Sequence, residues 1–250
     1  MSKISSLLFA LLLVLSNVSA LTTIYAPITR SVQTGSTFAL GVAAPGHVIT
    51  IIMDRGHTSD PWKRVEVTPN WLKGVEITED RMWITLTVPR AAEKKTYQLD
   101  FRLFGNASKE EFGTTIMVVS DTLETNTTTN VVEGRAGEPV HVPVLIINKS
   151  IGETRARISC SLPKDYCESM DIPLSPGASV LVEYPILYPV PGDHRLTIKI
   201  QDLGSLATHR HTVILSLKNT IKNEFRLLAF ALPVVEPILL PLRSILVYVP

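Results

Sequence analysis

The central part of the chain, from Thr22 to Lys218, alternates apolar and polar residues and has no long helical repeat. Apolar side chains recur at every second position in short runs, and Gly, Pro, Asn and Asp residues separate the runs. A period of two places successive side chains on opposite faces of a sheet, so each run predicts a β-strand with one buried face. The predicted strands cover residues 38–42, 48–52, 83–88, 97–103 and 115–119, then 140–146, 156–160, 179–184, 195–200 and 211–215.

These strands form two sets that follow each other as a repeat of about 100 residues, in which Thr34-Gly35-Ser36 aligns with Ala136-Gly137-Glu138. Between the sets, residues 121–130 are polar, rich in Thr and without a core-forming stripe, so we interpret them as a linker. Several short strands per hundred residues are typical of antiparallel sandwiches. The predicted fold is therefore all-β, with two tandem immunoglobulin-like β-sandwiches at residues 21–120 and 131–218.

The second half carries a pattern of turns at fixed places. Gly137-Glu138 precedes a core strand, Asn148 ends that strand, Pro176-Gly177 precedes an apolar strand, and a Pro-x-x-Gly turn at 189–192 precedes the last hairpin. Over about 80 residues this pattern resembles the immunoglobulin-like envelope modules of archaea and bacteria, of the CARDB and alpha-galactosidase-associated types. The resemblance implies a structural or adhesive role at the cell surface and brings no catalytic residues with it.

The first 20 residues have the three parts of a secretory signal peptide. Lys3 precedes an apolar run at 7–15, and the small residues Val18-Ser19-Ala20 follow. The run covers about half of the roughly 20 residues that a membrane-spanning helix needs, which argues against an uncleaved anchor. We therefore predict that residues 1–20 are removed and that the protein is exported.

The C-terminal segment, 219–250, is apolar almost throughout from residue 225 onward. Three prolines and three charged residues interrupt it: Pro233, Pro237, Pro241, Arg226, Glu236 and Arg243. Interior prolines disfavour one continuous spanning helix. The segment could lie in or dip into a membrane, dock on a partner, or extend the core of the last domain; a lipid-anchor signal lacks its small-residue site. We favour association of residues 225–250 with a membrane or a partner, because so apolar a segment would aggregate in water.

Composition removes several classes of function. With 24 Lys and Arg against 23 Asp and Glu, the net charge is +1, which offers no field to attract nucleic acid. The charged fraction of 19% is too low for a disordered chain. The length suits one large or two ordinary domains.

Export changes the interpretation of two further features. Asn106, Asn126 and Asn148 each begin an Asn-x-Ser/Thr sequence, so they are candidate glycosylation sites on exposed loops if the host glycosylates its exports. Cys160 and Cys167 are the two cysteines of the chain, and in an oxidising compartment we expect them to form a disulfide that fixes a local turn.

The first half contains the candidates for ligand binding. Residues 54–62 form the loop that we most expect to bind a ligand, because it has both charges, the imidazole of His57 and the indole of Trp62; a solvated turn is the alternative. Trp83 alternates with threonines, opposite an aliphatic face, so it is exposed if that face is buried. Tryptophans that only fill the core remain the alternative.

The sequence offers little that could carry catalysis. His209 and His211 share one side of a strand at a spacing that can bind zinc, but apolar residues continue on that side, and we place the pair at the rim of the sandwich without a metal. His57 next to Ser59 and Asp60 is not a triad, because catalytic groups converge in space and not in a linear cluster. We predict no catalytic residues and no cofactor.

Together these features predict a non-catalytic structural or adhesion protein of the extracellular space or cell envelope, tethered by its C-terminal segment. Its partner would be a protein or a glycan at the cell surface. A carbohydrate-binding module that uses exposed tryptophans is the alternative. An enzyme would instead need a pocket in which His57 or His211 meets a carboxylate.

Overall fold

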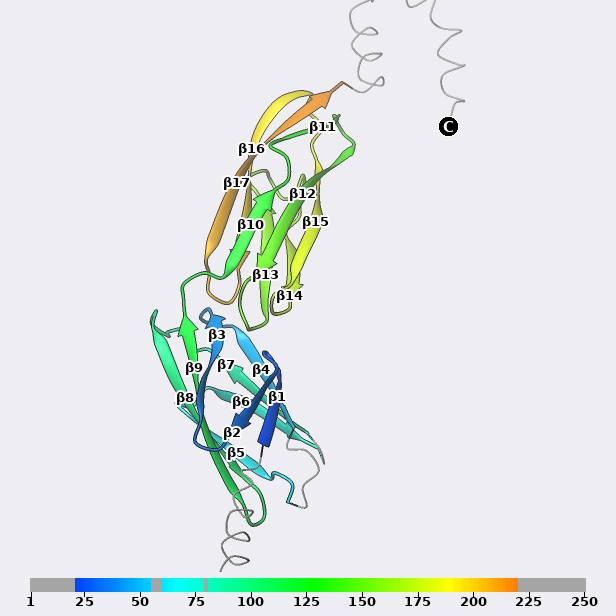
Figure 1. Ribbon diagram of the computed structural model, residues 1–250. Helices are drawn as coiled ribbons and strands as arrows, with labels where there is room; N and C mark the ends of the chain where they lie inside the picture. Colours follow the sequence, from blue (N-terminus) through cyan, green and yellow to red (C-terminus); the bar gives the residue numbers. More distant parts are fainter. Residues whose placement is uncertain (1–20, 55–59, 79–80, 220–250) are drawn as a thin grey trace, which may run out of the picture.

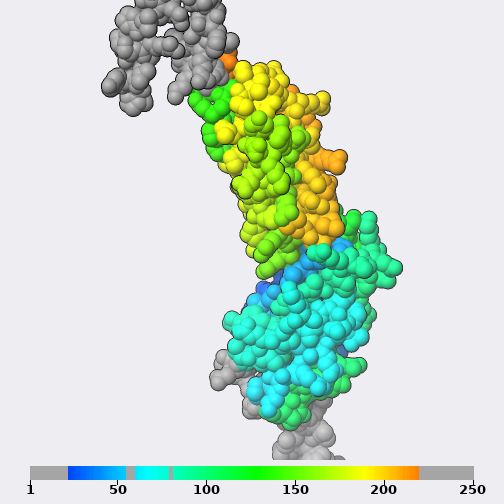
Figure 2. All heavy atoms as spheres, turned by 180° about the vertical axis from the view of Figure 1, so that it is seen from behind, coloured from blue at the N-terminus to red at the C-terminus, as the bar shows by residue number. Residues whose placement is uncertain are grey.

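The computed structural model describes residues 21–54, 60–78 and 81–219. This part of the chain is all-β, and its seventeen strands form two sandwiches stacked end to end (Figures 1 and 2). The predicted fold class, two tandem immunoglobulin-like sandwiches, is confirmed. The predicted signal peptide and the apolar segment from residue 220 onward lie outside the described residues. Among the described residues, no helix is long and apolar enough to cross a membrane.

Domain 1 consists of two facing sheets. One has the strand order β2-β1-β4-β7-β6 and the other the order β3-β9-β8-β5. The strands are β1 (Leu21–Ala26), β2 (Arg30–Gln33), β3 (Thr37–Ala43), β4 (Val48–Asp54), β5 (Arg64–Thr68), β6 (Leu72–Ile77), β7 (Arg81–Thr87), β8 (Thr96–Phe104) and β9 (Lys109–Val118).

Domain 2 also has two sheets, with the orders β10-β12-β15 and β11-β17-β16-β13-β14. Its strands are β10 (Leu123–Thr127), β11 (Val131–Arg135), β12 (Pro139–Asn148), β13 (Thr154–Cys160), β14 (Met170–Leu174), β15 (Ser179–Leu187), β16 (Gly192–Asp202) and β17 (Thr208–Lys218).

The two domains share one topology. Strands β1, β3, β4, β5, β7, β8 and β9 correspond to β10, β11, β12, β13, β15, β16 and β17 in order and in pairing. Each domain has a single parallel pair among its described strands, β3 with β9 and β11 with β17. Domain 1 adds β2 and β6, and domain 2 adds β14. The repeat predicted from the sequence is therefore a repeat of strand order as well.

One detail of the predicted alignment is wrong. Gly137 corresponds to Gly46 and not to Gly35, because Gly46 and Gly137 each precede the second core strand of their domain. Both have a positive φ, of 78° and 82°, and their N–H groups donate to the carbonyls of Val88 and Tyr188, just after β7 and β15. Gly35 belongs to the extra β2–β3 turn, which has no counterpart in domain 2.

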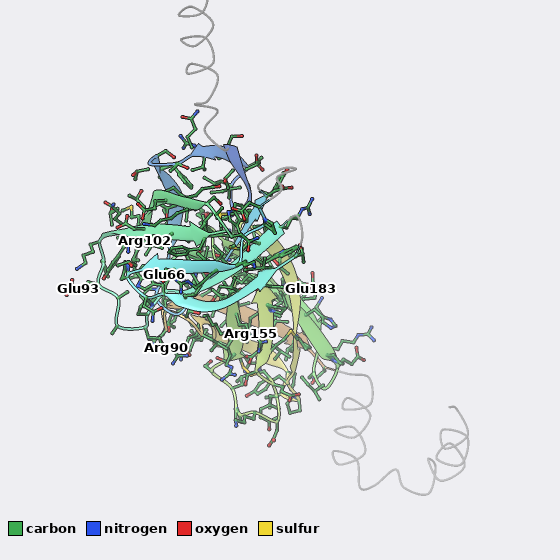
Figure 3. The ribbon with its side chains drawn as sticks, turned by 90° about the horizontal axis from the view of Figure 1, so that it is seen from below. Glu66, Arg90, Glu93, Arg102, Arg155 and Glu183 are labelled. Atoms are coloured by element: carbon green, nitrogen blue, oxygen red, sulfur yellow. A yellow bond between two sulfur atoms is a disulfide. The ribbon has the colours of Figure 1, made fainter. Side chains whose placement is uncertain are left out.

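Strict alternation builds each core. In β4 and β7 every second residue is fully buried, as Ile49, Ile51, Ile84 and Leu86 illustrate. The remaining positions point to the outer face and are partly or fully exposed, and they carry both polar and apolar residues. The cross-strand neighbours Glu66 and Arg102 lie on the exposed side of β5 and β8 (Figure 3). Burial of one face per sheet is what orders strands this short.

The predicted linker at residues 121–130 is wrong. Leu123–Thr127 forms β10, the first strand of domain 2, and pairs with β12 from Leu123↔Asn148 to Thr127↔Val144. Leu123 and Thr127 are buried even though the segment is polar overall. The domains are therefore connected by a few residues only, which limits their separation.

Two edges of domain 2 carry a proline inside the strand. Pro173 lies in β14 and Pro185 in β15, each the outermost strand of its sheet. A proline has no N–H to donate to an added strand, so it is tolerated at an edge and weakens pairing there.

Candidate functional site

A buried histidine lies where domain 1 meets domain 2. His47, in the turn before β4, and Asp202, the last residue of β16, both have 0% of their surface exposed. The His47 Nε2 lies 2.8 Å from an Asp202 carboxylate oxygen, and its Nδ1 lies 2.9 Å from the Ser150 hydroxyl. Ser150 follows β12, so domain 2 supplies both partners of a domain 1 side chain.

Serine, histidine and aspartate connected in this way resemble the chain of contacts in a hydrolytic triad. Here Ser150 is only 2% exposed, and its oxygen accepts a hydrogen bond from the backbone N–H of Gly152 at 2.9 Å. A substrate carbonyl would have to reach that oxygen for attack to occur. In this closed arrangement the three residues can hold the domains together but cannot reach a substrate.

The Asp202 carboxylate is surrounded by donors. Besides His47 it accepts from the hydroxyls of Thr154 at 2.5 Å and Ser205 at 2.6 Å, and from the backbone N–H of Gly204 at 3.0 Å. Burial alone would raise its pKa, but the hydrogen bonds from His47, Ser205 and Thr154 favour the charged form and hold the pKa well below its usual range. Asp202 is therefore a buried carboxylate that stays ionised.

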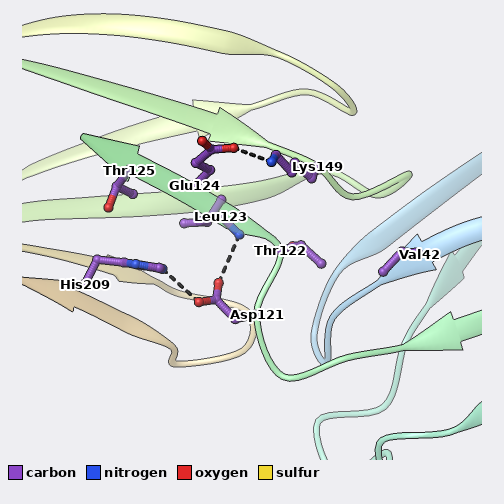
Figure 4. A pocket seen from close by; sticks show the side chains of 8 residues that line it. All are labelled: Val42, Asp121, Thr122, Leu123, Glu124, Thr125, Lys149 and His209. Atoms are coloured by element: carbon purple, nitrogen blue, oxygen red, sulfur yellow. Dashed lines mark hydrogen bonds and ion pairs between the residues drawn. The ribbon is translucent and has the colours of Figure 1, made fainter.

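A shallow hollow of about 520 Å³ lies beside this joint (Figure 4). It is lined by Val42, Asp121, Thr122, Leu123, Glu124, Thr125, Lys149 and His209. Its charged groups pair with one another: Lys149 pairs with Glu124, and the His209 Nε2 lies 2.9 Å from Asp121. The second contact is close enough for an ion pair but lacks hydrogen-bond geometry. The side chains of Glu124 and Asp121 that line the hollow thus each already lie against a neighbouring side chain.

The two strand histidines do not converge on one point. His209 faces Asp121, whereas the His211 Nε2 lies 2.8 Å from the Thr125 hydroxyl. Burial lowers the pKa of His211, and the neighbouring His209 lowers it further. Within the ranges that the structure describes, no three His, Cys, Asp or Glu side chains are grouped closely enough to hold a metal ion.

The tryptophans of domain 1 have different environments. Trp62 is only 5% exposed and Trp71 only 6%, and both belong to the core. The expectation that Trp62 offers an exposed ring is therefore wrong, because the loop before β5 turns this indole inward. His57, the third predicted ligand-binding residue, lies outside the described residues.

Trp83 lies on the outer face of its sheet, as the alternation predicts. It is partly exposed on β7, and its register neighbours are Ile52 on β4 and Glu76 on β6. On the same face, Tyr25 is 47% exposed and the Arg81 guanidinium lies 5.5 Å from the centre of its ring. This face therefore combines two aromatic rings with charged side chains.

The three glycosylation candidates have different environments. Asn106 is exposed in the β8–β9 turn, and Asn126 is exposed on β10. Asn148 is fully buried, and its amide nitrogen donates to the carbonyls of Gly152 at 2.9 Å and Ser175 at 3.0 Å. The expectation that Asn148 lies on an exposed loop is wrong, because its amide joins two loops of domain 2.

The predicted disulfide is present. Cys160 and Cys167 are bonded, with their Cα atoms 6.3 Å apart. The bond closes the loop between β13 and β14. It therefore fixes a local turn and does not connect the two sheets.

No protein-family model matches the chain, and no curated protein matches it either. Among solved structures, it is similar to an endo-fucoidan hydrolase of glycoside hydrolase family 107, with 11% identity, 75% of this chain covered and a TM-score of 0.39. The chain spans only 28% of that enzyme. It is also similar to a chimeric titin Z1Z2, with 12% identity, 81% of this chain and 99% of that chain covered and a TM-score of 0.38.

Fibronectin(III)-like modules of Clostridium thermocellum CbhA share 16% identity, with 79% of this chain and 94% of theirs covered and a TM-score of 0.28. Because these TM-scores are all below 0.5, the fold is assigned from the strand pairing of this chain itself. This pairing gives two tandem β-sandwiches of the predicted immunoglobulin-like class.

Proposed function

We propose that this chain is a non-catalytic structural or adhesion module of the cell surface or envelope. The two sandwiches form its folded body, and residues 225–250 tether it to a membrane or to a partner. The partner class is a protein or a glycan at the cell surface. The finer resemblance to CARDB-type envelope modules, which rests on the turns between Gly137 and Gly192, supports the same role.

One observation carries the proposal. The cluster that could in principle perform hydrolysis, Ser150 with His47 and Asp202, is sealed between the domains, and its bonds connect them. Buried polar groups whose hydrogen bonds are all made within the protein stabilise its structure. The apolar C-terminal sequence and the signal-like start support export and attachment.

Membrane fractionation tests the tether. The full chain and a chain ending at Lys218 are expressed side by side. The full chain should sediment with membranes and resist extraction with high salt, whereas the shortened chain should be released into the soluble fraction. Equal partitioning of the two chains would contradict the membrane tether.

A glycan-binding role is the second candidate, and the outer face of domain 1 favours it. Trp83 and Tyr25 offer ring faces there, and aromatic rings with polar groups beside them suit sugars. The Trp83→Ala variant should lose retention on immobilised polysaccharide. Leu181→Ala, which removes a 57% exposed side chain from domain 2, is the matched control. Unchanged retention of Trp83→Ala would reject this role.

A further inference from the structure

The end of β3 and the start of β4 in domain 1 are in direct backbone contact with domain 2. Val48 and Glu153 exchange two hydrogen bonds, of 3.1 and 2.7 Å, and so form an antiparallel bridge between the domains. The Ile151 N–H donates to the Val42 carbonyl at 2.9 Å. The Ile151 side chain packs against the core of domain 1. Strands β3 and β4, one from each sheet of domain 1, are therefore hydrogen-bonded to the β12–β13 loop of domain 2.

Side-chain hydrogen bonds also connect the two domains at this boundary. His47 uses both ring nitrogens on residues of domain 2, and Asp202 is fixed in turn by Thr154, Ser205 and the Gly204 N–H. Rotating one domain against the other would break the His47 contacts and leave a buried carboxylate without its main partner. An uncompensated buried charge is strongly disfavoured.

The two domains also approach each other so closely at three glycines that little space is left for one domain to shift against the other. A Cβ added at Gly46 would lie 2.7 Å from the Gly204 carbonyl oxygen, and one added at Gly41 would lie 2.6 Å from the Ile151 Cγ2. At Gly204, a Cβ would meet the His47 ring at 2.9 Å. Glycine is required at these places because the opposite domain occupies the space of a side chain.

From these contacts we infer that the two sandwiches form one stiff body with a fixed angle, locked by the Ser150–His47–Asp202 chain and the Val48–Glu153 bridge. Tandem domains usually move about their linker. Here the linker is short and the contact is filled with buried polar groups. The inference concerns only the folded body, so it stands or falls independently of the tether and of any ligand.

Pulsed electron paramagnetic resonance on the full chain in detergent micelles tests the inference. Spin labels are placed at Glu76→Cys on β6 and Arg195→Cys on β16, both exposed and in different domains. The native chain should give one narrow distance distribution. His47→Ala should broaden that distribution about twofold or more. His141→Ala, at an exposed histidine of β12, should leave the width unchanged.

A glycine pair gives a second test if His47→Ala does not fold. Gly46→Ala and Gly35→Ala introduce the same side chain at nearly the same φ, 78° and 80°, but only the first meets domain 2, since nothing lies within 4 Å of a Cβ at Gly35. Gly46→Ala should widen or shift the distance distribution, and Gly35→Ala should not. A broad distribution in the native chain would overturn the inference, as would an unaltered one in both His47→Ala and Gly46→Ala.

Discussion

The imidazole of His47 and the carboxylate of Asp202 are 155 positions apart in the chain and lie 2.8 Å from each other across the domain boundary. Neither is exposed to solvent. A buried charge is tolerated when hydrogen bonds replace its water, and Asp202 has such bonds from both domains. The stability of domain 2 is therefore coupled to the position of domain 1.

Removing the carboxylate should reveal this coupling. Asp202→Ala leaves the His47 ring, Thr154 and Ser205 without their common acceptor, and we expect it to lower the free energy of unfolding by about 3 kcal/mol. Urea denaturation followed by circular dichroism measures the change. Asp193→Ala, at an exposed position of β16, is the matched control and should stay within about 0.5 kcal/mol of the native chain. A loss below about 1 kcal/mol for Asp202→Ala would contradict the coupling.

Acid should act through the same residue. The pKa of Asp202 is well below its usual range in the folded protein, so the unfolded chain takes up the proton first as the pH falls. The stabilisation from Asp202 should be complete above about pH 4 and should decline as the pH falls below it. Unfolding free energies of the native chain and of Asp202→Asn, measured between about pH 2 and pH 6, check this. The native chain should show the steeper fall, and equal slopes would refute the assignment.

His211 should titrate at a lower pH than an exposed histidine. Burial, and then the charge of His209, lower its pKa, so protonation favours the unfolded chain. Its stabilising contribution is complete above about pH 6.5, the usual value, and is lost as the pH falls. Nuclear magnetic resonance titration of the imidazole signals measures the pKa. His209→Gln should move it upward, and a titration that His209→Gln leaves unaltered would show that the neighbouring charge has no effect.

The buried sequon should behave differently from the exposed ones. The Asn148 amide links the Gly152 and Ser175 carbonyls, so Asn148→Ala should destabilise the protein by about 2 kcal/mol. Asn126→Ala, at an exposed sequon, should have little effect on stability. Thermal unfolding of both variants measures the difference. Equal melting temperatures would contradict the structural role of Asn148.

The sequence predicts the strands in which several apolar residues recur at every second position. All ten predicted runs are strands, because each has a clear apolar face. The missed strands give a weaker signal: β5 alternates but has only two apolar residues in five, β6 does not alternate regularly, and β10 is rich in Thr. In β10, pairing with the neighbouring β12 and the burial of Leu123 and Thr127 order a segment that reads as a linker in isolation.

The joint between the domains was not predicted, and its residues explain why. His47 stands between a turn and an apolar strand, and Asp202 ends a strand just before an ordinary polar turn. Nothing local connects two positions so far apart, because their contact depends on the angle between whole domains. The one local signal is the set of glycines around them, Gly46, Gly152 and Gly204, which mark close approach only once the partner is known.

Proline at the outer strands of domain 2 bears on how many copies could be crowded on one surface. Pro173 and Pro185 offer no amide hydrogen to a strand of a neighbouring molecule, so they disfavour edge-to-edge pairing of sheets between molecules. Molecules of this protein at high local density are therefore expected to stay separate and not to assemble into β-fibrils.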